Sequence, residues 1–231
     1  MKFENTEVWG FEHALRGMRN PKNSWDKSDS YRPDCCHNCD DCDEYDCQNT
    51  SFDCSYIIGE NDMKLAQTLI SAGSEHRKFM RQIFVSVDIT APLYWWKEFD
   101  TYKVGTVANS TSTMHKLAST PITMDCFEID DYCDIITTNA QFNYEVKTTW
   151  EDLIETLDWL RVKYLETNDK RYWKELIRLL PESWLQTRTV TMNYENLLAM
   201  CSKGQRRHHK LNEWSGVDNP DLTNFISWAR T

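Results

Sequence analysis

Cysteines are the first side chains in this sequence whose spacing indicates chemistry. Six of the nine fall in one short stretch: Cys35, Cys36, Cys39, Cys42, Cys47 and Cys54. Thiolates at Cys36, Cys39, Cys42 and Cys47 would supply the four soft ligands of a tetrahedral zinc ion, so we predict a metal site there. The spacing is not that of two separated C-x-x-C pairs, so an iron–sulfur cluster, free thiols and disulfides are the alternatives.

The same stretch carries much of the negative charge. The chain has 231 residues, with 36 acidic and 26 basic side chains and a formal charge of −10. Seven of the acids and no Lys or Arg lie between Pro33 and Cys54. We therefore expect residues 31–60 to be an insert, too poor in apolar residues for its own core, within a single domain spanning residues 1–231.

Charge and hydropathy limit the partners of the chain. An acidic protein does not favour an extended nucleic-acid surface or an anionic membrane. No apolar run is long enough to span a bilayer, and the start of the chain, Met1 to Glu7, lacks the apolar core of a signal peptide. We expect a cytoplasmic protein without a membrane partner.

The hydrophobic pattern predicts an α/β (α+β) fold. A helix is expected from Asn61 to a stop at Gly73, and the alternation from Ile83 to Ile89 is typical of a strand with one buried face. Another helix should follow Pro92. The C-terminal half predicts helices over about 148–164, 169–180 and 186–200 and one beginning at residue 220.

Two polar segments are candidate ligand sites. Residues 104–113 are small or hydroxyl-bearing, and Gly105 and Ala108 leave room beside Asn109 and Ser110. We expect this segment to approach a ligand; the alternative is an edge strand with exposed hydroxyls. The run from Arg206 to Lys210 is the densest positive cluster and suits an anion, whereas the other interpretation is a charged loop.

One family resembles this sequence in the order of its motifs. Gly73-Ser74-Glu75-His76, the strand that follows, Ala91-Pro92, and later Leu180-Pro181 with Asn193 are similar to the core of the flavin-dependent thymidylate synthases. The resemblance covers residues 61–115 and 175–214. The Arg-His-Arg triplet of that family falls on Thr101-Tyr102-Lys103, so one of three positions keeps a positive charge.

The resemblance implies a fold and a reaction. The fold would be a twisted, mainly antiparallel sheet flanked by helices, assembled as a homotetramer with shared active sites. The reaction would be the reductive methylation of dUMP to dTMP by a methyltransferase, with FAD as cofactor and with NADPH and methylenetetrahydrofolate as co-substrates.

The resemblance also implies roles for particular residues. His76, Lys103, Asn109 and Asn193 would contact the flavin. Ser110 and Arg178 would contact the nucleotide, and Arg206 and Arg207 would be catalytic. Two other functions fit the sequence. One is a nucleotide-binding relative with a different or lost pyrimidine-modifying activity, and the other is a zinc-stabilised binding protein.

Overall fold

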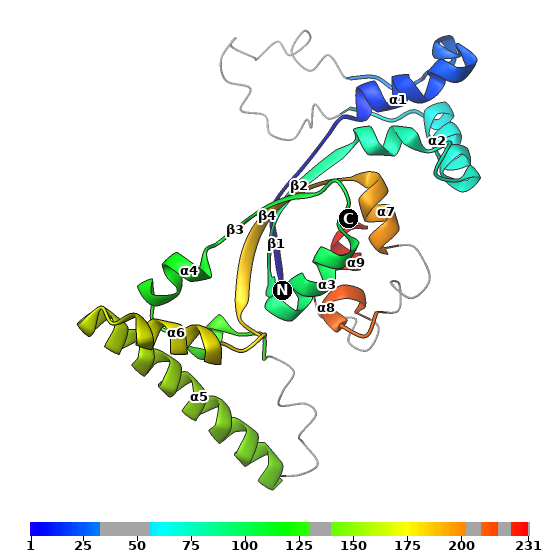
Figure 1. Ribbon diagram of the computed structural model, residues 1–231. Helices are drawn as coiled ribbons and strands as arrows, with labels where there is room; N and C mark the ends of the chain where they lie inside the picture. Colours follow the sequence, from blue (N-terminus) through cyan, green and yellow to red (C-terminus); the bar gives the residue numbers. More distant parts are fainter. Residues whose placement is uncertain (33–55, 130–139, 202–208, 217–222, 231) are drawn as a thin grey trace, which may run out of the picture. The chain divides into compact units, whose positions relative to one another are not determined.

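The computed structural model describes residues 1–32, 56–129, 140–201, 209–216 and 223–230 (Figure 1). The chain divides into two compact units. Unit 1 consists of Met1–Thr6, Ser86–Thr191 and Leu198–Thr231, and unit 2 consists of Glu7–Val85 and Met192–Leu197. The single domain over residues 1–231 stays a prediction, and most of the expected insert lies outside the described residues.

The predicted α/β class is confirmed by a four-stranded antiparallel sheet flanked by helices. Its order is β1 (Lys2–Trp9), β2 (Phe84–Pro92), β4 (Leu185–Asn193) and β3 (Val107–Ser110). β3 and β4 pair from Val107 opposite Thr191 to Ser110 opposite Arg188. Side-chain hydrogen bonds between β2 and β4 also follow an antiparallel order: Thr191 pairs with Ser86, and Thr187 pairs with Thr90.

β2 forms where the alternating pattern predicted it. Val85, Val87, Ile89 and Ala91 are at most 2% exposed, because every second side chain of the strand faces the core. Pro92 then acts as the N-cap of α3 (Leu93–Tyr102), so the strand leads directly into the helix.

The expected helix over residues 186–200 is wrong in its first half, which forms β4. Threonines at every second position, 187, 189 and 191, favour a strand because β-branched side chains pack well on a pleated surface. Val190 and Met192 alternate with them and are fully buried. Only α7 (Tyr194–Cys201) is helical. As a result, Arg188 lies on a strand and Asn193 at its end.

Unit 1 places helices beside its strands, as Figure 1 shows for α3, α8 (Asn212–Ser215) and α9 (Phe225–Trp228). Trp95, Trp96 and Phe99 of α3 are fully buried; Trp95 packs with Trp214 and Phe225, and Phe99 packs with Phe225. The Trp95 and Trp214 ring centroids are 5.4 Å apart. These aromatic side chains of α3 form the core.

Two antiparallel helices form a second core in unit 1 (Figure 1). They are α5 (Ala140–Thr167) and α6 (Lys170–Leu179), near the short α4 (Thr113–Lys116). Leu157, Leu160 and Leu176 are at most 5% exposed there. The Asp169 carboxylate caps α6 by accepting the Arg171 N–H at 2.9 Å, so this helix begins where the sequence predicted it. α5, however, begins before the start predicted at about residue 148, and the terminal helix is the short α9.

Unit 2 is built from α1 (Phe11–Arg19), α2 (Glu60–Ala72) and the 3-10 helices η1 (Asn20–Lys22) and η3 (Lys78–Gln82). Leu15, Met18, Ala66, Phe79 and Met80 form its core, each at most 7% exposed. α2 forms within one residue of the range that the apolar spacing predicted.

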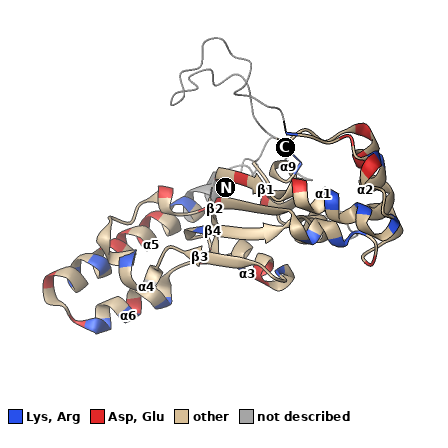
Figure 2. Cartoon of the chain, turned by 90° about the horizontal axis from the view of Figure 1, so that it is seen from above, with Lys and Arg blue, Asp and Glu red and all other residues tan. Residues whose placement is uncertain are grey.

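Charges of both signs are mixed along the helices (Figure 2). No helix among the described residues is long and apolar enough to cross a membrane.

Candidate functional site

The free edge of the sheet brings together several polar residues that the sequence singled out. β3 is one of the two edge strands, and both Asn109 and Ser110 are exposed on it. Ser110 lies opposite Arg188 of β4, and Asn109 opposite Thr189. Opposed residues of an antiparallel pair have Cβ atoms about 4.5–5.5 Å apart, so the Ser110 hydroxyl and the Arg188 side chain occupy one small area. The edge-strand alternative is confirmed for these residues, and it does not exclude a ligand.

Arg188 has the best-defined geometry at this edge. Its guanidinium carbon lies 4.2 Å from the centroid of the Trp96 ring. Nε donates to Gln186 Oε1 at 3.0 Å, and Nη1 donates to both carboxylate oxygens of Asp100 at 3.2 and 3.3 Å. Within the described part of the chain Nη2 has no acceptor. The guanidinium is therefore fixed in place with a donor left over, an arrangement that suits a phosphate or a carboxylate.

Lys103 reaches the same group of charges. Its Nζ lies 2.9 Å from Asp100 Oδ1, so this one carboxylate is shared between Lys103 and Arg188. Two cations and one anion leave a positive balance that attracts an anionic ligand. Lys103 can provide a point charge for a phosphate but not the paired donors of a guanidinium.

His76 lies in unit 2, at a cavity of about 390 Å³. Its backbone N–H donates to Gly73 O at 3.0 Å, in the turn where α2 ends. Gly73 has φ 112°, a value that glycine adopts without strain, so it sets the direction of this turn. The cavity volume falls within the range of about 300–1,000 Å³ typical of small-molecule sites.

The lining of this cavity is amphipathic. Met18, Leu65, Leu69 and Phe79 contribute apolar surface. The polar lining includes Asn20, Lys22, His76, Lys78 and Gln82. Glu75 also lines the cavity and is 3.9 Å from Lys78 Nζ. A planar apolar ring and an attached anion could both be accommodated by such a surface.

Arg77, which the sequence analysis missed, anchors the turn that carries His76. Its side chain is 8% exposed and forms a fork on Glu195, with Nε to Oε2 and Nη2 to Oε1 both at 2.8 Å. This hydrogen bond raises the pKa of Arg77. No local motif indicates this ion pair, because 118 positions of sequence separate Arg77 from Glu195.

Asn193 begins α7 through a reciprocal cap with Asn196. The Asn196 N–H donates to Asn193 Oδ1 at 3.0 Å, and the Asn193 N–H donates to Asn196 Oδ1 at 3.2 Å. The Asn193 side-chain oxygen is thus occupied by the helix. Its NH₂ group has no acceptor among the residues that the structure describes, so it can donate to a ligand.

With this geometry in view, known proteins provide a comparison. No protein-family model matches the sequence, and no curated protein matches it. Among solved structures, two of thymidylate synthase X (ThyX) from Helicobacter pylori, both with FAD and dUMP, are similar with a TM-score of 0.53 and 13% sequence identity. The match covers 87% of this chain and 82% and 83% of those chains. The chain has a ThyX-like fold.

The likeness to ThyX confirms the fold that the motifs implied, and the role of each residue stays a prediction. Arg178 lies on α6 with its Nη1 3.0 Å from Glu175, and it takes no part in the contacts described for Ser110. The other predicted site residues lie outside the described residues: Arg206, Arg207, Cys36, Cys39, Cys42 and Cys47. Within the described ranges no group of His, Cys, Asp and Glu side chains could hold a metal ion.

A polar face of α3 was also missed. Tyr94, Glu98 and Tyr102 are four residues apart, and this helical spacing was the available signal. His209 Nε2 lies 3.0 Å from Glu98 Oε1, while His209 Nδ1 accepts the Leu211 N–H at 3.1 Å. Hydrogen bonds from Tyr102 and His209 hold the pKa of Glu98 below its usual value, although burial opposes them.

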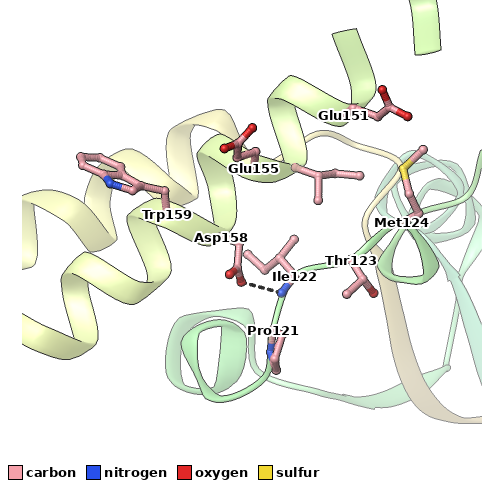
Figure 3. A pocket seen from close by; sticks show the side chains of 9 residues that line it. Pro121, Ile122, Thr123, Met124, Glu151, Glu155, Asp158 and Trp159 are labelled. Carbon is pink, nitrogen blue, oxygen red and sulfur yellow. Dashed lines mark hydrogen bonds between the residues drawn. The ribbon is translucent and has the colours of Figure 1, made fainter. Parts of the chain in front are cut away.

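A larger cavity, about 550 Å³, lies along α5 (Figure 3). Glu151, Glu155 and Asp158 line it, and Asp158 accepts the Ile122 N–H at 2.9 Å. Asp158 is paired with Arg161 and Glu151 with Lys147, and the lining residues include no Lys, Arg or His that could bind a phosphate. This cavity therefore does not fit an anionic nucleotide despite its greater volume.

Proposed function

We propose that the protein is a flavin-dependent thymidylate synthase-like enzyme that binds FAD and dUMP and forms dTMP. Methylenetetrahydrofolate would be the one-carbon donor and NADPH the source of reducing equivalents. The observation that carries the proposal is the ThyX-like fold, which FAD- and dUMP-containing structures share. Two observations support the proposal: His76 lines a cavity together with Lys22 and Lys78, and Ser110 lies opposite Arg188.

The residues present fit part of FAD. The His76 cavity combines an apolar wall with basic side chains, which suit a planar ring and a phosphate respectively. Within unit 2, His76 and Asn193 would hold the cofactor, and the flavin contacts that the resemblance implies for Lys103 and Asn109 stay part of the proposal. FAD supplies the redox chemistry when bound. His76 would contact its phosphate or ring edge, and Asn193 would donate from its NH₂ group.

The sheet edge would bind the nucleotide. The Arg188 guanidinium, stacked on Trp96, would donate to the dUMP phosphate, and the exposed Ser110 hydroxyl would donate beside it. We therefore add Arg188 to the nucleotide-binding residues proposed from the resemblance, Ser110 and Arg178; Arg206 and Arg207 keep the catalytic role that the resemblance implies. Because Asp100 already compensates part of the positive charge, phosphate binding would compete with its contact to Arg188.

A second candidate function is a nucleotide-binding relative with a different or lost pyrimidine-modifying activity. The observation that favours it is the pairing of Lys103 with Asp100, because the one cation kept from the family's triplet is already engaged. Asn109 and Thr113 also stand near the positions of a glutamate and an arginine of the family motif.

Three further properties belong to the same proposal. The assembly would be a homotetramer with shared active sites, which light scattering during gel filtration can measure. The location would be cytoplasmic. Cys36, Cys39, Cys42 and Cys47 would bind zinc, so protein purified without chelator should contain about one equivalent of metal by elemental analysis.

The test combines dUMP binding with product formation. Protein reconstituted with FAD should show a higher melting temperature with dUMP and should form dTMP when NADPH and methylenetetrahydrofolate are added. Uridine serves as the matched ligand control because it lacks the phosphate. dUMP stabilisation without dTMP would favour the second function, and no stabilisation by dUMP would contradict both functions.

A further inference from the structure

A second cavity in unit 2 contains none of the residues assigned above. Its volume is about 310 Å³, and α1 and the chain around residues 25–32 and 56 line it. The side chains that dominate the lining are Arg16, Arg19, Arg32, Trp25, Tyr31 and Tyr56. Three guanidinium groups and three aromatic rings around one small cavity are unusual in a chain with a formal charge of −10.

Arg19 forms a rigid wall of this cavity. Its side chain is 4% exposed, and Nε donates to Asp62 Oδ1 at 2.5 Å while Nη1 donates to Ser24 O at 3.1 Å. The Ser28 and Ser30 hydroxyls each donate to Asp62 Oδ2 at 2.6 Å. The Asp62 carboxylate therefore accepts hydrogen bonds from Arg19, Ser28 and Ser30, and it holds these three side chains in fixed positions.

Arg16 and Arg32 carry the charge that is available to a ligand. Within the described residues Arg16 has no ion-pair or hydrogen-bond partner, although it lines the cavity. Arg32 Nη2 lies 3.7 Å from Glu12 Oε2, and both side chains are largely exposed. Such a long, exposed pair contributes little to stability, so a ligand can displace it at small cost.

The aromatic side chains give the cavity walls for a planar ring. Trp25 is 49% exposed, and its Nε1 donates to Asn20 Oδ1 at 2.9 Å, which orients the indole. Tyr31 is 55% exposed, while its backbone is fixed by two hydrogen bonds to Ile57 at 2.8 and 3.0 Å. A ligand ring stacked on either would cover apolar surface that is now in contact with water.

We propose that this cavity binds small organic anions in which a phosphate or a carboxylate is attached to an aromatic ring. The Arg16 guanidinium forms paired hydrogen bonds with the anion, and Arg32 contributes after leaving Glu12. The ring stacks on Trp25 or Tyr31. This cavity and the His76 cavity share no lining residue, so either proposal can fail without the other.

Calorimetric titration tests the site. The full chain is used because residues 33–55 connect Arg32 to Tyr56. The probes are phenyl phosphate, benzoate and inorganic phosphate. Phenyl phosphate should bind with a dissociation constant below about 1 mM, and inorganic phosphate at least about tenfold more weakly. Comparing phenyl phosphate with benzoate distinguishes the two anionic groups.

Matched variants distinguish binding in the cavity from nonspecific attraction to positive charge. Arg16→Ala should weaken phenyl phosphate about tenfold, whereas Arg81→Ala, which removes an exposed arginine outside the cavity, should leave binding unchanged. Tyr31→Ala should weaken phenyl phosphate and leave inorganic phosphate unaffected. Glu12→Gln should tighten both, because it frees Arg32. Arg16→Lys keeps the positive charge but not the paired donors of the guanidinium. Its affinity for phenyl phosphate should therefore lie between those of Arg16→Ala and the natural protein.

The proposal is overturned if neither phenyl phosphate nor benzoate binds at about 10 mM. It is also overturned if Arg16→Ala and Arg81→Ala weaken binding equally, because net charge would then account for the affinity. FAD uptake by the Arg16→Ala variant should equal that of the natural protein.

Discussion

The buried ion pair between Arg77 and Glu195 should hold the turn that carries His76. Replacing Arg77 by Met leaves the Glu195 carboxylate without its fork of donors, and removing one partner of a buried pair costs about 3–5 kcal/mol. The Glu195 side chain is 18% exposed, so water can compensate part of the loss, and we expect about 3 kcal/mol. For a chain of this size that corresponds to a melting temperature about 6–12 °C lower.

Thermal unfolding followed by circular dichroism measures this loss. The matched control is Lys97→Met, which breaks the pair of Lys97 with Glu182, whose side chains are 71% and 53% exposed. An exposed pair contributes at most about 1 kcal/mol, so the control should shift the melting temperature by no more than about 4 °C. The double variant Arg77→Met/Glu195→Met should recover most of the loss, because no buried charge is left unpaired.

Equal losses in Arg77→Met and Lys97→Met would refute the reasoning, as would a double variant as unstable as the sum of its single variants. Arg77 does not line the His76 cavity. If Arg77→Met binds FAD more weakly, the cause would therefore be a displaced His76. Unchanged FAD binding would contradict the role of Arg77 in positioning His76.

Three further predictions follow from single groups. Arg188→Ala should weaken dUMP binding about tenfold in calorimetry while Arg178→Ala changes it less, and the reverse order would contradict the choice of Arg188. Burial raises the pKa of Asp62, but hydrogen bonds from Ser28, Ser30 and Arg19 outweigh it and hold that pKa below its usual value. The stability that these bonds contribute is present above the unfolded pKa of about 3.9 and is lost as the pH falls through the lower folded pKa. In urea denaturation the free energy of unfolding of the natural protein should therefore exceed that of Asp62→Asn by a constant difference from pH 7 to about 5, and by a smaller difference at lower pH. A difference that stays constant down to pH 2 would disprove this. Burial raises the pKa of Cys201 to about 12, so iodoacetamide at pH 8 should modify Cys201 only after unfolding. Rapid labelling of Cys201 itself in the native protein would count against this.

The sequence predicted the elements whose pattern is local. β2 and α2 have one buried face each, and alternation or helical spacing along a few turns is enough to identify them. β4 was misassigned because Leu185 to Met192 combines apolar residues with threonines in a pattern that fits either period, and its partner strands are nearly a hundred positions away.

The candidate site was predictable only in part, for the same reason. His76, Asn109, Ser110 and Asn193 lie in motifs that can be compared position by position. Arg188 became a candidate only when strand pairing put it opposite Ser110. Contacts such as this one depend on strand register, and no short window of sequence contains that information.

Flavin content tests the central claim most directly. The purified chain, incubated with excess FAD and freed of unbound cofactor by gel filtration, should be yellow and retain about one FAD per chain by absorbance, and His76→Ala should retain less. A chain that stays colourless after this treatment would contradict the account, because the ThyX-like fold would then be present without the cofactor on which the proposed reaction depends.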